Sequence, residues 1–221
     1  MDGTLIQPLL LSLRVSLLAS LVVVPLGTLL GLLLSRSRFP GRSLLEGFLM
    51  LPLVLPPTVT GSYLIVLLGR SGPVGSLWHR LTEGSIPFTW QAASIAAAII
   101  SLPIMVRSAS AALGAVDRQL EEASYCLGKT RVETFWRVSL PLASRGLLAG
   151  AVLSFSRALG EFGATLLLAG NIPGRTQTMP LAIYEAVAAG EDERARVLAL
   201  LLTVVSIVVV MLAARFEPAR P

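Results

Sequence analysis

Five long apolar runs take up more than half of this 221-residue chain and restrict its fold more than any other feature. A helix needs about 20 mostly apolar residues to cross the hydrocarbon layer of a membrane, which is ~30 Å thick. The runs that reach this length cover residues 9–34, 44–69, 90–113, 142–170 and 197–214. The pattern predicts an all-α integral membrane protein with five transmembrane helices in a single domain, residues 1–221.

The composition supports this fold class and excludes several others. Charged residues make up 14 % of the chain, whereas an average soluble domain has about 25 %. A single histidine and a single cysteine exclude a multi-histidine metal site and an internal disulfide. The formal net charge of +5 comes from few charged residues, so we expect contact with membrane lipid and no nucleic-acid partner.

Basic residues in the short loops predict how the chain is oriented, because cytoplasmic loops are enriched in Lys and Arg. The segments after the first, third and fifth runs hold more basic residues than the other two loops, and they alternate as five spans require. We therefore predict an N-terminus outside the membrane and a cytoplasmic C-terminus. The basic residues counted as inside are Arg36, Arg38, Arg42, Arg107, Arg118, Lys129, Arg131, Arg137, Arg145, Arg215 and Arg220.

Small residues and prolines mark the interior of the spans. Two glycine pairs, Gly27 with Gly31 and Gly146 with Gly150, have the spacing that lets helix backbones approach closely in lipid. We expect these pairs to pack helices within one subunit. Prolines remove backbone donors and are expected to interrupt three of the spans, at Pro25, Pro52, Pro56, Pro57 and Pro103.

The proline pair in the second run is followed by three hydroxyl side chains. In lipid, backbone groups freed by a helix break must be satisfied by protein or by water in a cavity. Two interpretations stay open, a structural kink and a polar path through the membrane. The residues that would line such a path are Thr58, Thr60 and Ser62.

The fourth run contains two ionisable residues, Arg157 and Glu161, which stand four apart and therefore share a helix face. Ionisable groups inside a membrane usually face protein or a water-filled cavity. Either Arg157 contacts an anion in transit, or the two side chains neutralise each other and fix a helix contact. We favour the second interpretation.

The loop between the third and fourth runs, about residues 115–141, predicts two short helices at an angle. Asp117 is a candidate N-cap for the first, and Gly128 is a natural helix stop. Thr130 and Glu133 have the spacing of a capping box at the start of the second helix. We expect Pro141 to close that second helix and to open the fourth span.

This loop resembles the EAA motif of ABC importer permeases. Glu122, Ala123 and Ser124 are followed at the motif's spacing by Gly128 and by the segment Val138-Ser139-Leu140-Pro141. The chain departs from the motif at two positions, Ser124 in place of Ala and Val138 in place of Ile. Within the family, segments 38–41, 51–57 and 157–164 look like permeases for tetrahedral oxyanions, and segments 169–178 and 180–184 resemble molybdate permeases more than sulfate or thiosulfate permeases.

The resemblance implies the permease fold of a type I ABC importer with five transmembrane helices, or six in relatives that carry an extra N-terminal span. It implies a multi-pass protein of a bacterial or archaeal cytoplasmic membrane, in which two copies form the pathway and an external binding protein delivers molybdate. Two cytoplasmic ATPase subunits would bind ATP and Mg, so this chain would hold no cofactor and catalyse no reaction. The residues expected to couple to the ATPase are Glu122, Ala123, Ser124, Leu127, Gly128, Leu140 and Pro141.

Several alternatives remain at this stage. Sulfate, thiosulfate and tungstate are the other candidate substrates. An intramembrane enzyme is a rival of a different class, but the sequence lacks the motifs of metalloproteases, serine hydrolases and P-loop proteins. A secondary transporter is another rival, although such proteins commonly show inverted repeats, and we find no internal repeat here.

Overall fold

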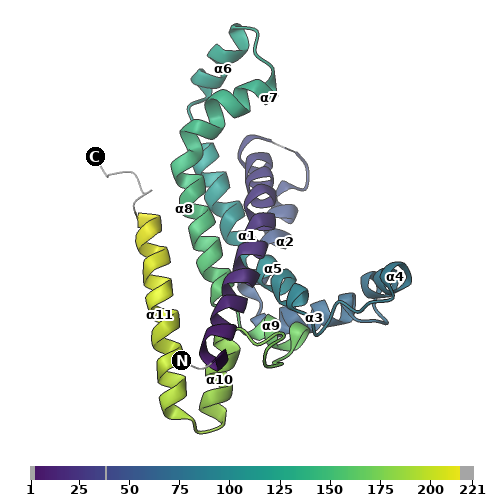
Figure 1. Cartoon of the computed structure of the whole chain (residues 1–221). Helices are drawn as coiled ribbons and strands as arrows, with labels where there is room; N and C mark the ends of the chain where they lie inside the picture. Colours follow the sequence, from purple (N-terminus) through teal and green to yellow (C-terminus); the bar gives the residue numbers. More distant parts are fainter. Residues whose placement is uncertain (1–2, 38, 215–221) are drawn as a thin grey trace.

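The computed structural model is all-helical over the residues it describes, 3–37 and 39–214 (Figure 1). Three of the basic residues used to predict orientation, Arg38, Arg215 and Arg220, lie outside these ranges. The helices are α1 Gly3–Arg36, α2 Arg42–Val54, α3 Pro57–Leu68, α4 Pro73–Thr82, α5 Trp90–Gly114, α6 Arg118–Cys126, α7 Arg131–Thr134, the π-helical turn η1 Phe135–Ser139, α8 Leu140–Leu159, α9 Gly163–Ala169, α10 Met179–Ala188 and α11 Asp192–Ala214.

Among the described residues, four helices are long and apolar enough to cross a membrane, and the bent pair α2–α3 raises the number to five if it counts as one span. The four are formed by residues 5–36, 90–114, 131–159 and 192–212. The predicted runs 9–34 and 90–113 fall inside the first two, and the run 197–214 falls inside α11. The predicted all-α membrane fold is therefore confirmed, and two of the predicted runs are divided differently.

Helix α5 is the centre of the bundle, with α1 and α8 packed along it (Figure 1). Glycines make these contacts possible. A Cβ added at Gly31 of α1 would lie 2.5 Å from the Ala109 Cβ, and one added at Gly150 of α8 would lie 2.5 Å from the Ser108 Cβ. The glycine pairs therefore pack helices within one chain, as predicted. Small side chains complete the fit, and five alanines of α5 are fully buried: Ala92, Ala93, Ala96, Ala97 and Ala109.

The second predicted run is not one helix, because α2 and α3 meet at an angle of 111°. Leu55 and Pro56 at the junction have extended backbone, with ψ values of 142° and 136°. Two consecutive prolines remove two amide donors, and each disfavours helical backbone in the residue before it. The expected interruptions at Pro25, Pro52 and Pro103 are wrong, because these single prolines lie inside α1, α2 and α5 without ending them.

The fourth predicted run is also divided differently. Residues 131–159 form one continuous helix, so the prediction that Pro141 closes a separate helix is wrong. Within the π-turn the Leu140 N–H donates to the Phe135 carbonyl, five residues back. The wider turn just before Pro141 removes the steric conflict that a proline causes in a regular helix. The run ends early instead, because the chain breaks at residues 160–162 before α9.

A separate packed region lies at the end of the bundle opposite α6 and α7 (Figure 1). There α10, which the sequence analysis did not predict as a separate helix, packs with the start of α11 and of α1. The backbone N–H of Met179 donates to the Ser12 hydroxyl of α1 at 2.7 Å. The segment before α10 is fixed by burial of Thr176, Gln177 and Thr178.

Candidate functional site

Two helices joined by a short turn, residues 118–134, project from one end of the bundle, and we call them the α6–α7 hairpin (Figure 1). The Asp117 carboxylate accepts the Gln119 N–H at 2.9 Å and caps α6, as predicted. The hairpin turn depends on Gly128, whose φ of +79° is unfavourable for other residues. A side chain there would meet no atom of the described chain within 4 Å, so backbone conformation and not space requires the glycine.

The predicted capping box is present at the start of α7. The Thr130 hydroxyl accepts the Glu133 N–H at 3.2 Å, and the Glu133 carboxylate accepts the Thr130 N–H at 3.0 Å. Since α7 continues through the π-turn into α8, this cap fixes the outer end of one helix that runs back through the bundle. The outer end of this continuous helix is therefore part of the hairpin.

Apart from Gly128, the predicted coupling residues form three groups: an exposed set on the hairpin, the inward-facing Ser124, and a pair at the start of α8. Glu122, Ala123 and Leu127 are exposed at the hairpin, and the Leu127 side chain is 81 % exposed although it is apolar. Ser124 faces inward, and its hydroxyl lies 2.9 Å from the Thr134 hydroxyl, which ties α6 to α7. Ser124 is thus part of the hairpin's own packing and not of its exposed face.

Leu140 and Pro141 are not at the hairpin. They lie at the start of α8, where Leu140 packs against the core cluster that contains Leu113, Val116 and Ala143. The two halves of the motif are therefore an exposed part at the hairpin and a part at the start of α8, where Leu140 is partly buried and Pro141 is exposed. Both lie on the path from the hairpin to the transmembrane helices.

Arg157 and Glu161 form an ion pair of 2.8 Å across one turn at the end of α8. Glu161 is 2 % exposed, and its second carboxylate oxygen accepts the Ala164 N–H at 2.9 Å. The carboxylate therefore neutralises Arg157 and caps the first turn of α9 across the chain break. This arrangement agrees with the interpretation we favoured, a pair that fixes a helix contact.

The two broken segments of the chain pack against each other. A Cβ added at Gly61 of α3 would lie 2.8 Å from the Ala164 Cα, and one added at Gly163 would lie 3.1 Å from the Pro57 Cβ. The three hydroxyls of the predicted path do not share one face. Thr60 is buried, and within the described residues its hydroxyl has no hydrogen-bond partner, whereas Thr58 and Ser62 are exposed one helical turn apart.

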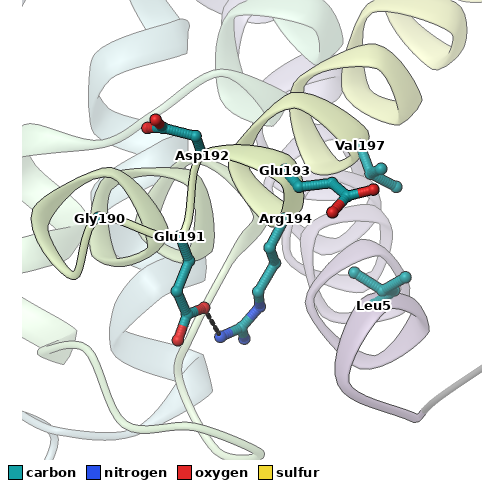
Figure 2. A pocket seen from close by; sticks show the side chains of 7 residues that line it. All are labelled: Leu5, Gly190, Glu191, Asp192, Glu193, Arg194 and Val197. Carbon is teal, nitrogen blue, oxygen red and sulfur yellow. Dashed lines mark hydrogen bonds and ion pairs between the residues drawn. The ribbon is translucent and has the colours of Figure 1, made fainter.

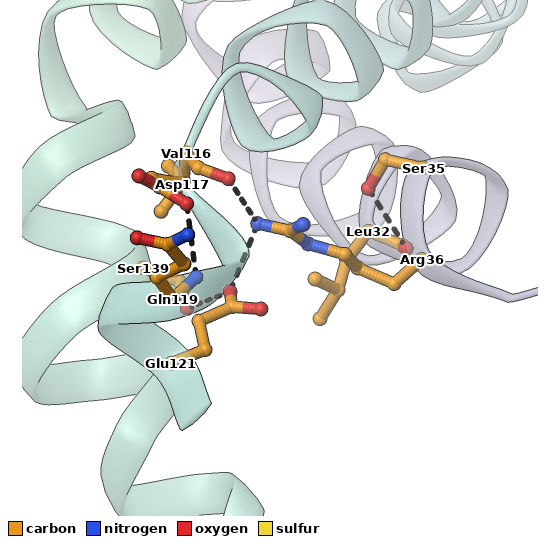
Figure 3. A network of polar contacts seen from close by, with 8 residues as sticks. All are labelled: Leu32, Ser35, Arg36, Val116, Asp117, Gln119, Glu121 and Ser139. Atoms are coloured by element: carbon orange, nitrogen blue, oxygen red, sulfur yellow. Dashed lines mark hydrogen bonds and ion pairs between the residues drawn. The ribbon is translucent and has the colours of Figure 1, made fainter. Parts of the chain in front are cut away.

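The sequence analysis did not predict one polar network at the root of the hairpin, by which we mean the place where α6 meets the end of α1 (Figure 3). There Arg36, the last residue of α1, meets Glu121 of α6, which precedes the motif residue Glu122. The two are 85 residues apart, so no local pattern could have joined them. Two features of the sequence could have suggested the pair. They are a basic residue at a helix C-terminus and an acidic residue beside the motif.

The opposite end of the bundle has an open hollow of about 680 Å³ between the starts of α1 and α11 (Figure 2). Its charged side chains are partly paired, since Arg194 and Glu191 form an ion pair of 2.8 Å. The acidic residues are exposed at the rim, and we assign them no binding role. The lining residues are Leu5, Gly190, Glu191, Asp192, Glu193, Arg194 and Val197.

Comparison with known proteins decides the family. The family model described as "Binding-protein-dependent transport system inner membrane component" matches residues 24–220. The chain belongs to this family. As a transport-system inner membrane component, it is neither an intramembrane enzyme nor a gradient-driven secondary transporter, and the predicted membrane location and non-catalytic class are confirmed.

Relatives of this permease are similar over most of its length. The Molybdenum transport system permease protein ModB of Escherichia coli (strain K12) is 42 % identical over 218 residues, which cover 97 % of this chain and 95 % of that protein. The Sulfate transport system permease protein CysW of Synechococcus elongatus is 38 % identical over 210 residues, which cover 93 % of this chain and 73 % of that protein.

Solved structures agree with the fold. The MetNI methionine ABC transporter, in inward facing conformations, matches with a TM-score of 0.70 at 17 % identity over 99 % of this chain and 100 % of that chain. A bacterial ABC transporter for the polysaccharide alginate matches with a TM-score of 0.74 at 20 % identity over 97 % of this chain and 79 % of that chain. The predicted ABC permease fold is thereby confirmed.

Proposed function

We propose that this chain is the transmembrane permease subunit of an ATP-driven importer of molybdate. The observation that carries the proposal is the near-full-length similarity to ModB, a molybdenum transport permease. The other features fit a subunit that moves an ion without making or breaking a covalent bond. They are a helical membrane bundle, a projecting hairpin and two packed helix breaks.

The proposed complex contains two copies of this permease, two cytoplasmic ATPase subunits and an external binding protein. ATP and Mg bind to the ATPase subunits. The N-terminus lies outside and the C-terminus in the cytoplasm, which places the α6–α7 hairpin on the cytoplasmic side. Family membership supports the dependence on a binding protein.

The hairpin is the proposed contact with the ATPase. The apolar Leu127 is largely uncovered by the described chain, and exposed Ala123 permits close approach of a partner surface. Glu122 adds a charge on the same short helix, and Gly128 turns the chain away. Ser124, Leu140 and Pro141 connect this surface to α8, so nucleotide-driven movement of the ATPase would shift transmembrane helices between inward-open and outward-open states.

The anion path is proposed to run by the helix breaks. Thr58 and Ser62 have exposed hydroxyls next to the junction of α2 and α3. The buried hydroxyl of Thr60 has no hydrogen-bond partner among the described residues. Weak, neutral donors suit a path, because a strong anion site would slow release. Arg157 and Glu161 are proposed to hold the second break in place, and their ion pair supports this.

The substrate is tested by ligand binding to the external binding protein and by transport in vesicles that contain the whole complex. We expect molybdate to bind and to stimulate ATP hydrolysis. Tungstate should bind and stimulate nearly as strongly, because its charge and geometry are nearly the same. The similarity to CysW makes sulfate the second candidate. Sulfate or thiosulfate transport without preference for molybdate would overturn the substrate assignment.

A further inference from the structure

The polar network at the root of the α6–α7 hairpin joins three helices through one carboxylate (Figure 3). The Arg36 guanidinium donates to Glu121 Oε1 at 2.9 Å and to the Val116 carbonyl at 3.1 Å. The Ser139 hydroxyl donates to the same Oε1 at 2.6 Å. Glu121 of α6 is therefore bonded both to the end of α1 and to the π-turn that leads into α8.

Burial distinguishes this ion pair from the other pairs near the ends of the bundle. The side chains of Arg36 and Glu121 are 17 % and 13 % exposed, whereas both partners of the Lys129–Glu133 pair are 39 % exposed. Ser139 is 3 % exposed. Charge-assisted hydrogen bonds are stronger than neutral ones, and an ionised partner left alone in such a place is costly.

Few other side-chain hydrogen bonds among the described residues hold α6 to the bundle. Among the hydrogen bonds of the described residues, the side chains of α6 reach beyond the helix and its cap only through Glu121 and through the Ser124–Thr134 contact. The Ser124 contact stays within the hairpin. The connection from α6 to α1, and the direct connection to the π-turn, both depend on Glu121.

We propose that Glu121, held by Arg36 and Ser139, is a positioning residue that makes α6 move as one body with α1 and α8. This inference rests on the proposed coupling role of the hairpin. Glu121 need not touch the ATPase or the anion. It fixes the angle at which α6 meets the bundle, so that a displacement of α6 is transferred to two transmembrane helices and is not absorbed by bending at the ends of α6.

The test uses the whole complex with its ATPase and binding protein in vesicles, and measures molybdate transported per ATP hydrolysed. A cysteine at position 127 (Leu127→Cys in a Cys126→Ser background) reports docking to the ATPase by crosslinking. The variants are Glu121→Gln, Arg36→Gln and the conservative Arg36→Lys. Lys129→Gln is the matched control, because it removes an ion pair of the same hairpin that is exposed and local.

We expect Glu121→Gln and Arg36→Gln to lower the transport-to-hydrolysis ratio by about tenfold while the crosslink persists. Arg36→Lys should keep most of the ratio because it retains the charge, and Lys129→Gln should leave it unchanged. An unchanged ratio in both Gln variants overturns the role of Glu121. A parallel loss of transport, hydrolysis and crosslinking also overturns it, since that result indicates a purely structural contact.

The same experiment separates this inference from the proposed function. If the Leu127→Cys, Cys126→Ser complex with Glu121 and Arg36 intact forms no crosslink, the hairpin is not the contact with the ATPase, and the proposed coupling role of the hairpin falls together with the positioning role of Glu121. If the crosslink forms and the ratio is insensitive to Glu121, only the positioning role falls.

Discussion

One added methyl group at Gly31 is expected to destabilise the helix bundle, whereas the same change at Gly47 should stabilise it. A Cβ at Gly31 would lie 2.5 Å from the Ala109 Cβ and 2.8 Å from the Ser110 backbone nitrogen. Carbon atoms in contact prefer about 3.5–4.0 Å, so α1 and α5 would have to separate by roughly 1 Å. Gly47 lies on an exposed part of α2, where a Cβ meets no described atom within 4 Å.

The expected magnitudes follow from two opposing terms. Alanine is favoured over glycine inside a helix by about 0.5–1 kcal/mol, and this term applies at both positions. Overpacking costs about 1–3 kcal/mol and applies at Gly31 but not at Gly47, which leaves a net loss of about 0–2.5 kcal/mol at Gly31. Gly27→Ala should also destabilise the bundle, because the added Cβ would lie 2.5 Å from the Met105 Cγ and 2.8 Å from the Met105 Cβ, and a Cβ cannot move without its backbone.

The assay is unfolding of the purified permease in mixed micelles by titration with SDS, followed by far-UV circular dichroism. The three variants are compared with the parent at equal protein and lipid concentration. Stabilisation by Gly31→Ala similar to that by Gly47→Ala would refute the close contact between α1 and α5.

Three further outcomes concern the candidate site. Gly128→Val should insert normally but lose coupled transport, because a β-branched residue at a φ of +79° is strained by at least ~1–2 kcal/mol; normal transport in vesicles would contradict the role of this turn. Arg157→Gln should lower transport by less than about tenfold, since Glu161 still caps α9; a complete block with normal assembly would favour direct contact with the anion. Glu161→Ala should destabilise the protein by about 1–2 kcal/mol through loss of that cap, whereas Glu161→Gln should retain most of the stability in the same unfolding assay.

Local sequence patterns predicted the parts of the fold that depend on local chemistry. Apolar length identified the spans, Asp117 and the Thr130–Glu133 box marked the helix starts of the hairpin, and the glycine pairs indicated close packing. These predictions are correct because each depends only on interactions within one helix or one turn. The EAA-like motif likewise indicated the family before any contact was known.

The remaining features depend on contacts between distant segments. The continuous helix through Pro141 requires a π-turn, and apolar periodicity does not distinguish that turn from a regular helix. The inward position of Ser124 follows from its contact with Thr134, and the carboxylate of Glu121 finds its partner 85 residues away. Such contacts are set by how whole helices are arranged, so a single sequence does not specify them.

Helix α1 connects the two ends of the molecule by itself. Its Ser12 hydroxyl accepts the Met179 N–H of the α10 region, and its last residue, Arg36, bonds the root of the hairpin. At 1.5 Å per residue these two attachments lie about 36 Å apart along one helix axis, more than the ~30 Å of membrane hydrocarbon. A tilt of α1 about its middle would therefore move these two attachments in opposite directions.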